Sequence, residues 1–352
     1  MHIAIDGRSA FFYRGSGVGN YSYELIKNIF KINSYHSINI LSNTIYKKHK
    51  SFWELSNTPL ILTKHYDAFL NPHNGIGLPN NNAEKIITTL HDIIPSKLPE
   101  TVSPTYLKIY NENIFKILEK SHKILTVSNF SKNDISNTFN INKDKIHVTY
   151  LAPSKIYKPI QKNICRNFLK NFYNITFDYI LYIGGFSPRK NILGLIEGFS
   201  KLHNKNPNIK LLIIGFKGKS YENYFKRCCE LNLYNDVIFT GFIPTYDLPF
   251  FYSGAQCFIY PSFYEGFGLP PLEAMACETP VITSNVTSMP EILNDAPIYI
   301  NPYDVEDIYE NLYTLLNSPS LQKKARKNSL KHVKNFSWEK TSFNTLEFIC
   351  KN

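Results

Sequence analysis

The chain has 352 residues, of which 43% are hydrophobic and 19% charged, so it can bury a sizeable core and is not intrinsically disordered. This length indicates two domains; it excludes a small secreted disulfide scaffold, and no run reaches the roughly 18 apolar residues of a membrane span. The net charge of +11 leaves nucleic acid, an anionic membrane surface and a phosphate-bearing substrate as candidate partners.

The beginning of the chain and its cysteines bear on the compartment. Residues 3–6 are an apolar run that predicts a β-strand, and no basic segment precedes an apolar one as in a secretory signal. None of the six cysteines has C-x-x-C spacing. We therefore expect reduced cysteines and a cytoplasmic protein.

Short apolar runs alternate with amphipathic helical stretches along the whole chain. Such runs, rich in Ile, Leu and Val on both faces, are typical of buried parallel strands. The predicted strands are residues 3–6, 37–41, 86–90, 123–127, 147–150, 179–184, 210–214, 237–240, 257–260, 281–283 and 298–300. The alternation occurs twice, which predicts two doubly wound, Rossmann-like α/β domains with ligands at the carboxyl ends of their strands.

The boundary between the two halves is expected in the proline-containing, polar stretch 151–174, which is typical of a linker. We assign residues 1–155 to the first domain and 156–335 to the second. Residues 1–155 carry 18 Lys+Arg and 11 Asp+Glu, a balance of +7. A solvated basic surface and a surface that faces an anionic partner both explain this balance.

Two segments of the first half follow predicted strands and are therefore expected to line a ligand-binding cleft. Gly17, Val18 and Gly19 lie in a glycine-rich loop between the first strand and a helix over 21–30, and their amides could meet phosphates. A tight structural turn is the alternative. His91 follows the strand at 86–90 and is a second candidate for the cleft. A structural role is the alternative, because most lone histidines are structural.

The stretch 106–123 reads as an amphipathic helix with several lysines. It is either an ordinary surface helix or one that docks on anionic lipid. The lysines are Lys108, Lys116, Lys120 and Lys123.

Arg189 and Lys190 lie where the strand at 179–184 gives way to a helix. Two adjacent cations at such a turn can neutralise a leaving diphosphate. Cations at a helix start oppose the helix dipole, so a nearby anion explains them better than an exposed surface does.

The segment 260–276 combines a strand end, a glycine loop and a helix start. Gly266 and Gly268 permit unusual backbone angles, and the prolines at 270 and 271 predict that the helix begins there. Glu273 is then expected in the first helical turn, where it could accept hydrogen bonds from a ribose diol beside a bound diphosphate. Glu265 would lie nearer the bound group. The alternative is that Glu273 only complements the dipole and Glu265 is a solvated acid.

The string from Glu265 to Ala276 resembles the signature of retaining glycosyltransferases of the GT-B fold, in family 4 (glycosyltransferase group 1) and its mannosyltransferase-like branch. The resemblance covers nearly the whole chain. It implies that Glu273 binds the nucleotide ribose and Glu265 the donor sugar. It also assigns Gly266, Phe267, Gly268 and Leu269 to donor binding.

The same resemblance extends to other segments. It places Gly184, Arg189 and Lys190 in the phosphate-binding stretch and His91 against the donor sugar. Many relatives carry an arginine where this chain has Gly185, and Arg189 is the candidate replacement. The glycine loop 17–19 would contact diphosphate and acceptor, and the last helix, about 336–352, would pack back on the first domain. Phe242 and Ile243 mark the place where backbone groups hold the nucleotide base.

The resemblance implies retaining transfer of a hexose, with mannose favoured and GDP-mannose as donor, to a saccharide or lipid-linked saccharide. No Asp-x-Asp occurs, so no metal is expected in the site, and no cofactor beyond the donor. Another GT-B activity (an epimerase or a phosphorylase) and a non-catalytic nucleotide-sugar binder remain alternatives. From a different class, a basic nucleic-acid-binding protein is a further alternative, but the chain has no recognisable nucleic-acid-binding motif. The cytoplasmic face of a membrane is a further expected location.

Overall fold

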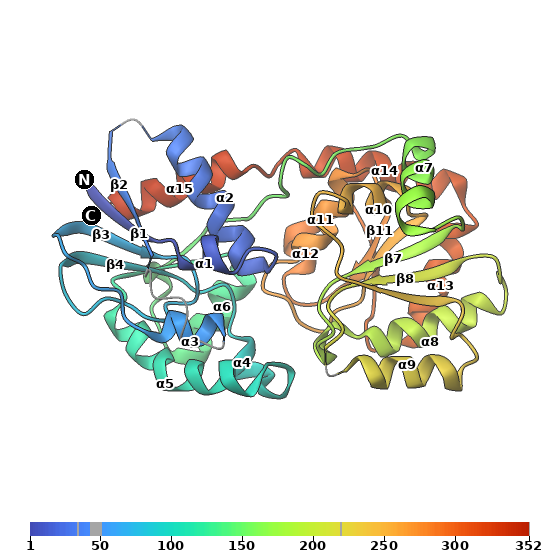
Figure 1. The fold of residues 1–352 in the computed structure, drawn as a ribbon, viewed down its shortest axis with the longest axis horizontal. Helices are drawn as coiled ribbons and strands as arrows, with labels where there is room; N and C mark the ends of the chain where they lie inside the picture. Colours follow the sequence, from blue (N-terminus) through green and yellow to red (C-terminus); the bar gives the residue numbers. More distant parts are fainter. Residues whose placement is uncertain (34, 43–50, 219, 352) are drawn as a thin grey trace. The chain divides into compact units, whose positions relative to one another are not determined.

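The computed structural model describes residues 1–33, 35–42, 51–218 and 220–351. The chain divides into two compact units: unit 1 is Met1–Ala152 with Phe336–Asn352, and unit 2 is Pro153–Asn335. Each unit is built on a six-stranded sheet in which every strand pair is parallel (Figure 1). The predicted α/β class is therefore confirmed.

The sheet of unit 1 has the strand order β2-β1-β3-β4-β5-β6. Sequence analysis missed β3, which pairs with both β1 and β4, because Asp67 and Asn71 interrupt its apolar run. The strands are β1 (His2–Asp6), β2 (Ser37–Leu41), β3 (Tyr66–Asn71), β4 (Ala83–Thr89), β5 (Lys123–Thr126) and β6 (Ile146–Val148).

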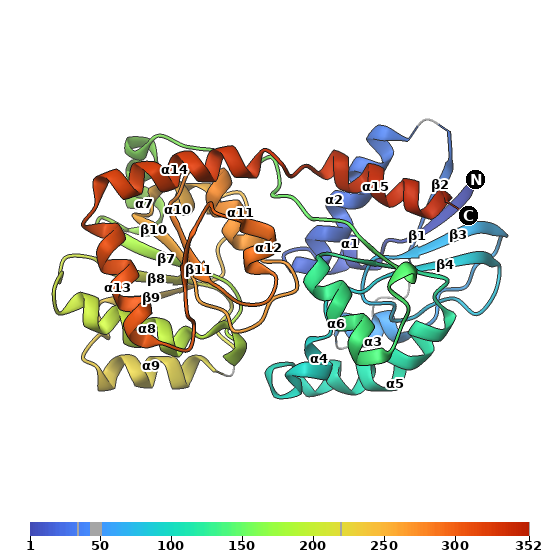
Figure 2. The same cartoon turned by 180° about the vertical axis from the view of Figure 1, so that it is seen from behind.

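Helices cover both faces of this sheet (Figures 1 and 2). On one face α15 packs on α2, which also contacts α1. The other face is covered by α5 and α6, whose buried side chains, among them Ile114 and Ile135, join one core with Phe69 of β3. The helices are α1 (Arg8–Phe12), α2 (Gly17–Ile32), α3 (Phe52–Asn57), α4 (Ile94–Lys97), α5 (Pro104–Lys120), α6 (Asn129–Phe139) and α15 (Trp338–Cys350).

The predicted helix at 106–123 corresponds to α5, which ends at Lys120. Lys123 instead lies in β5, where its ammonium group donates to the carbonyl of Phe348 at 2.9 Å and to that of Lys351 near the end of α15. Lysine side chains commonly satisfy helix-terminal carbonyls in this way. Of the four lysines expected on this helix, Lys123 therefore lies outside it.

The sheet of unit 2 has the order β12-β11-β10-β7-β8-β9. All residues of β7, β10 and β11 are buried, as expected for parallel strands that helices cover on both sides. The strands are β7 (Tyr179–Ile183), β8 (Lys210–Ile214), β9 (Val237–Gly241), β10 (Cys257–Tyr260), β11 (Val281–Ser284) and β12 (Ile298–Ile300).

In unit 2, α8, α9 and α13 lie on one face of the sheet, and α7, α10, α11 and α14 lie on the other (Figures 1 and 2). The linker predicted at 151–174 is shorter than expected, because residues 162–173 form α7, which packs on α10. The helices are α7 (Lys162–Tyr173), α8 (Ile192–His203), α9 (Tyr221–Glu230), α10 (Leu248–Gly254), α11 (Leu269–Ala276), α12 (Met289–Leu293), α13 (Val305–Leu316) and α14 (Pro319–Val333).

None of the helices within the described ranges combines the length and the hydropathy needed to cross a lipid bilayer.

Candidate active site

Three of the predicted side chains meet in unit 2. Arg189 and Lys190 lie in η3 (Pro188–Lys190), a single 3₁₀ turn before α8, and Glu265 lies in the loop after β10. The guanidinium Nη1 of Arg189 donates to Glu265 Oε1 at 3.0 Å, and the ammonium group of Lys190 donates to the same oxygen and to the hydroxyl of Tyr260. Burial alone would raise the pKa of the Glu265 carboxyl, but Arg189 and Lys190 outweigh it and lower that pKa to about 2.

The loop that carries Glu265 is fixed at several points. The amide of Phe263 donates to the carbonyl of Arg189 at 2.8 Å, and the hydroxyl of Ser288 donates to the carbonyl of Glu265 at 2.9 Å. Gly268 has φ +93°, and an added Cβ would lie 2.2 Å from Met289 Cε, so the turn into α11 requires glycine. The carboxylate is thus held in place by its surroundings before any ligand binds.

Glu273 is buried in α11 among tyrosines. The hydroxyl of Tyr252 donates to Glu273 Oε2 at 2.9 Å. Burial raises the pKa of the Glu273 carboxyl to about 7, although hydrogen bonds from Tyr252 and Tyr157 work against that rise. The two glutamates of the motif therefore titrate far apart.

The expected place of Glu273 in the first helical turn is wrong. Gly268 is the N-cap residue and α11 begins at Leu269, so the prolines take the second and third positions and Glu273 the fifth. The helix dipole acts mainly within the first turn. Glu273 therefore owes its environment to the two tyrosines and to burial.

His91 follows β4 in unit 1 and is buried. Its Nε2 lies 2.9 Å from the carbonyl of Pro72, and its amide donates to Asn74 Oδ1 at 3.1 Å. Its ring meets that of Tyr21 edge to face at 4.6 Å between centroids. Burial lowers the pKa of His91 to about 4, so the ring is neutral at pH 7.

The glycine segment of unit 1 is helical rather than a loop. Gly17, Val18 and Gly19 form the first turn of α2, and Ser16 caps it by accepting the Gly19 amide at 3.0 Å. A Cβ on Gly19 would lie 1.9 Å from the carbonyl oxygen of Tyr13, so only glycine fits. The prediction of a loop is wrong here because α2 begins at Gly17, capped by Ser16, and not at residue 21 as expected.

The remaining predicted residues lie at strand ends and in the glycine loop of unit 2. Gly184 follows β7, and Phe242 and Ile243 follow β9. Phe242 is 56% exposed and its ring lies 5.4 Å from that of Phe216, whereas Ile243 is buried. Gly266, Phe267 and Gly268 are buried and Leu269 is partly exposed.

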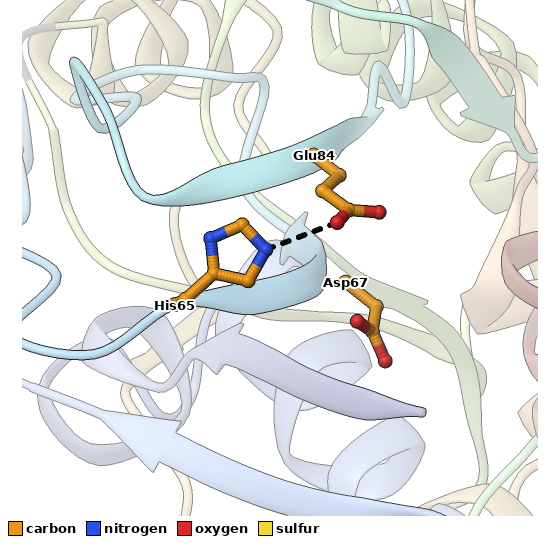
Figure 3. A group of neighbouring side chains, drawn as sticks. All are labelled: His65, Asp67 and Glu84. Atoms are coloured by element: carbon orange, nitrogen blue, oxygen red, sulfur yellow. Dashed lines mark hydrogen bonds and ion pairs between the residues drawn. The ribbon is translucent and has the colours of Figure 1, made fainter.

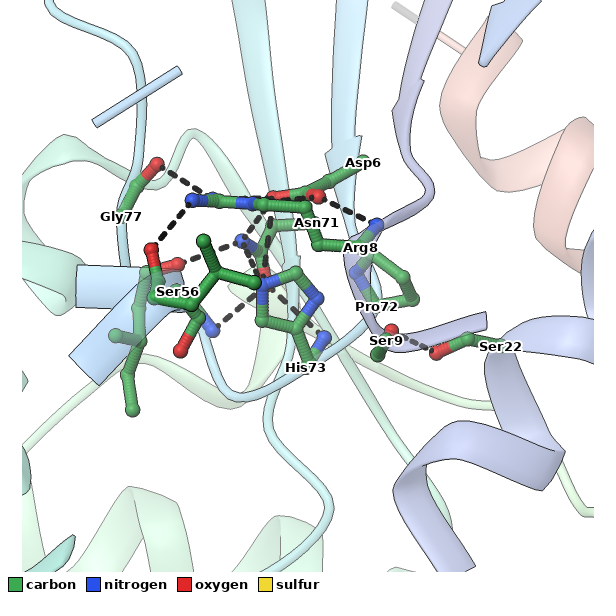
Figure 4. A network of polar contacts seen from close by, with 12 residues as sticks. Asp6, Arg8, Ser9, Ser22, Ser56, Asn71, Pro72, His73 and Gly77 are labelled. Atoms are coloured by element: carbon green, nitrogen blue, oxygen red, sulfur yellow. Dashed lines mark hydrogen bonds and ion pairs between the residues drawn. The ribbon is translucent and has the colours of Figure 1, made fainter. Parts of the chain in front are cut away.

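Sequence analysis missed a buried charged network in unit 1 (Figure 4). The guanidinium of Arg8 binds the carboxylate of Asp6 through Nε at 3.0 Å and Nη2 at 2.6 Å, and both side chains are fully buried. His73 Nε2 lies 3.3 Å from the same carboxylate. The available signal was a pair of opposite charges, with Asp6 as the last residue of an apolar strand and Arg8 two residues later.

One group of side chains of the metal-ligating kind occurs within the described ranges: His65, Asp67 and Glu84, near the amino ends of β3 and β4 (Figure 3). His65 Nε2 lies 3.0 Å from Glu84 Oε1, and Asp67 accepts the amide of His2 at 2.7 Å. None of these residues was predicted as a site residue. His91 lies beyond the opposite, carboxyl end of β4.

A model of the family "Glycosyl transferases group 1" matches residues 167–332. O-antigen chain mannosyltransferase B of Escherichia coli is 31% identical over an alignment 365 positions long, gaps included, which covers 95% of this chain and 96% of the relative. O-antigen chain mannosyltransferase RfbU of Salmonella typhimurium is 33% identical over 217 residues, 61% of this chain and 56% of the relative.

Among solved structures, a sucrose-phosphate synthase from Thermosynechococcus elongatus matches 99% of this chain and 98% of its own, with a TM-score of 0.75 and 19% identity. At that identity the likeness concerns the fold, and it confirms the expected GT-B class.

Proposed function

We propose, because the chain belongs to the group 1 family of glycosyl transferases, that it transfers a mannosyl residue from a nucleotide-diphosphate sugar, with GDP-mannose favoured. The acceptor is a saccharide or a lipid-linked saccharide in polysaccharide synthesis. Two relatives whose names specify O-antigen mannosyl transfer support the sugar and the pathway class. Members of this family retain the anomeric configuration.

The contact of Arg189 and Lys190 with Glu265 is the observation that carries the proposal. Two cations against one carboxylate leave one positive charge in excess. When a diphosphate binds at this cluster, its oxygens replace the desolvated Glu265 carboxylate as partners of Arg189 and Lys190. The negative charge that develops on the leaving diphosphate then meets hydrogen-bond donors that are already in place. Gly184 and the glycine segment 266–268 would supply amides to the same phosphates.

A same-face reaction suits these residues best. Double displacement needs a carboxylate nucleophile at the anomeric carbon, and the low pKa of Glu265 reflects its engagement with two cations. The departing phosphate would accept the acceptor proton. In this proposal Glu265 and His91 orient the donor sugar, Glu273 binds the ribose, and Phe242 and Ile243 border the base.

We assign donor binding to unit 2 and acceptor binding to unit 1. A thermal-shift screen with GDP, UDP and ADP tests the donor assignment, because a ligand present at 100 times its Kd stabilises the folded state by about 2.7 kcal/mol. GDP should raise the melting temperature, and Glu273→Ala should abolish the rise. A shift with UDP alone would refute the GDP assignment.

A further inference from the structure

The loop after β3 separates the buried network of Asp6 and Arg8 from His91. On one side, Asn71 and His73 contact the Asp6 carboxylate, with Asn71 Nδ2 at 3.4 Å and His73 Nε2 at 3.3 Å from Oδ2. On the other side, Pro72 and Asn74 bind His91. We propose that Asp6, Arg8, Asn71 and His73 are positioning residues that fix the orientation of His91.

The loop is tied down inside by Asn71. Its Oδ1 accepts the amides of His73 and Gly75, each at 3.0 Å, and its Nδ2 donates to the carbonyl of Ile76 at 3.1 Å. A single side chain therefore spans the turn. With Asp6 holding that side chain, the residues from 72 to 76 have little freedom to rotate.

The outer side of the loop binds His91 twice. The carbonyl of Pro72 faces His91 Nε2, and Asn74 Oδ1 accepts the His91 amide; the amide of Asn74 in turn donates to Thr89 at the end of β4. A carbonyl can only accept, so Nε2 carries the proton and Nδ1 of the neutral ring keeps its lone pair. Nδ1 is thus the nitrogen left to accept a hydrogen bond from a sugar hydroxyl.

Arg8 also binds backbone carbonyls of unit 1. Its Nη1 donates to the carbonyl of Thr58 at 2.7 Å and its Nη2 to that of Gly77 at 3.2 Å. Gly77 has φ +75°, and an added Cβ would lie 1.9 Å from the carbonyl of Ser56 (Figure 4). The backbone is therefore shaped so that its carbonyls reach the guanidinium.

Energetics favour a positioning role over a purely stabilising one. Burying an ion pair costs several kcal/mol per ion in desolvation, and well-packed apolar residues of similar size often stabilise a fold equally well or better. A hydrogen-bonded polar network, in contrast, fixes one arrangement of the groups that it holds, and here only Nδ1 of His73 among the network's side-chain nitrogens and oxygens is buried without a hydrogen-bond partner within the described residues. Here those groups are the loop 72–76 and, through it, the ring of His91.

The test uses the full chain and three variants. His73→Leu removes the His73–Asp6 contact and leaves the Asn71–Asp6 contact and the Asp6–Arg8 pair intact. His73→Gln restores a side-chain N–H donor and is the rescue variant. Ser136→Ala is the control, because it removes a partly buried hydrogen bond of unit 1, to the carbonyl of Ile141 at 2.7 Å, near the carboxyl end of α6. If His73→Leu fails to fold, Asn71→Ser takes its place.

The first readout is the nitrogen NMR spectrum of the histidine rings, which is independent of activity. In the wild type and in Ser136→Ala, His91 should show one neutral tautomer protonated at Nε2. In His73→Leu, both tautomers should appear, because the Pro72 carbonyl no longer fixes the proton on Nε2; His73→Gln should restore the wild-type signals. An unchanged His91 spectrum in folded His73→Leu overturns the proposal.

The second readout is mannosyl transfer, which links this inference to the proposed function on which it rests. In metal sites, loss of a residue that orients a ligating side chain typically costs 10- to 100-fold in activity. We expect kcat to fall by about that factor here, while the KM for the donor changes little. If the spectrum changes and transfer does not, the positioning of His91 is upheld and its contact with the donor sugar is refuted.

Discussion

Glu265 and Glu273 are eight residues apart in one loop–helix segment, yet their surroundings shift the pKa values of the two carboxyls in opposite directions. Arg189 and Lys190 keep the pKa of Glu265 at about 2, whereas Glu273, surrounded by tyrosines, has a pKa of about 7. Burial acts on both carboxyls in the same direction, so the nearby cations make the difference. Such divergence within one motif is typical of sites in which two carboxyls serve different purposes.

The raised pKa of Glu273 predicts a pH-dependent affinity for the nucleotide. A ribose diol donates hydrogen bonds to the ionised carboxylate, and that form becomes dominant only above pH 7. Between pH 6 and pH 8 the ionised fraction rises roughly tenfold, so the Kd for GDP should fall by about the same factor in calorimetric titrations.

Glu273→Gln is the control for this titration, because GDP itself also titrates. The variant should bind weakly and lose the pH dependence that the nucleotide alone does not explain. A second consequence concerns stability. Because the pKa of the Glu273 carboxyl is raised above its ordinary value of 4.5, the folded state holds the proton to higher pH than the unfolded state does. Wild-type stability should therefore decline from pH 4.5 to pH 7 relative to that of the variant.

Lys190 should be far more important for turnover than for folding. Lys190→Met removes one cation from the leaving-group site and leaves Arg189 to balance Glu265. Loss of one preorganised donor to developing charge costs about 100- to 1,000-fold in kcat, which a transfer assay with saturating donor measures.

Lys201→Met is the matched control for Lys190→Met. Lys201 lies in α8 of the same unit and pairs with Glu306 at the surface, where an ion pair contributes little to stability. Its transfer rate should equal that of the wild type. Equal losses in both variants would refute the role of Lys190.

Among the elements, the start of α2 gives a contrast between two nearby glycines. Gly19→Ala places a methyl group 1.9 Å from the Tyr13 carbonyl oxygen, whereas Gly17 has no neighbour within 4 Å of an added Cβ. Forced overpacking typically costs 1–3 kcal/mol, so urea unfolding should show about that loss for Gly19→Ala. Gly17→Ala should be neutral or slightly stabilising. Equal stability of the two variants would show that the α1–α2 turn adapts freely.

The elements that sequence analysis predicted well are those with long apolar runs. Residues 37–41, 210–214, 257–260 and 298–300 are strands with the predicted bounds. β3 was not predicted because polar residues interrupt its apolar run. α7 was not predicted because nearby prolines and polar residues suggested a linker. The start of α11 was placed one residue late because Leu269, before the two prolines, already has helical geometry.

The candidate site divides in the same way. Contiguous motifs such as 265–276 carry their chemistry in adjacent letters, so sequence suffices to propose them. The network around His91 is assembled from β1, α1 and the loop after β3, at residues 6, 8, 71 and 73. Only the parallel pairing of β1 with β3, a strand that sequence analysis missed, brings these residues together.

At the scale of the whole molecule, part of the net charge of +11 has a specific use. Arg189 and Lys190 face a carboxylate and, in the proposed function, a diphosphate. In unit 1, Lys108, Lys116 and Lys120 are exposed on α5, together with Phe115. We propose that this face contacts an anionic membrane surface that carries the acceptor.

Vesicle co-sedimentation tests this contact. Basic residues near an anionic surface contribute about 1 kcal/mol each, so replacing the three lysines of α5 by glutamine should release the protein from phosphatidylglycerol vesicles. Replacing Lys323, Lys324 and Lys327, exposed on α14, is the matched control and should leave binding unchanged. Equal binding by both triple variants would refute the assignment to α5.

The most direct test of the proposed function is transfer itself, with GDP-mannose and a mannose-terminated saccharide incubated with the full chain. Proton NMR of the product should show one new mannosyl residue whose α configuration matches that of the donor, and Lys190→Met should form it at least about 100-fold more slowly. A β-linked product, or transfer only from UDP-sugars, would contradict retaining mannosyl transfer from GDP-mannose.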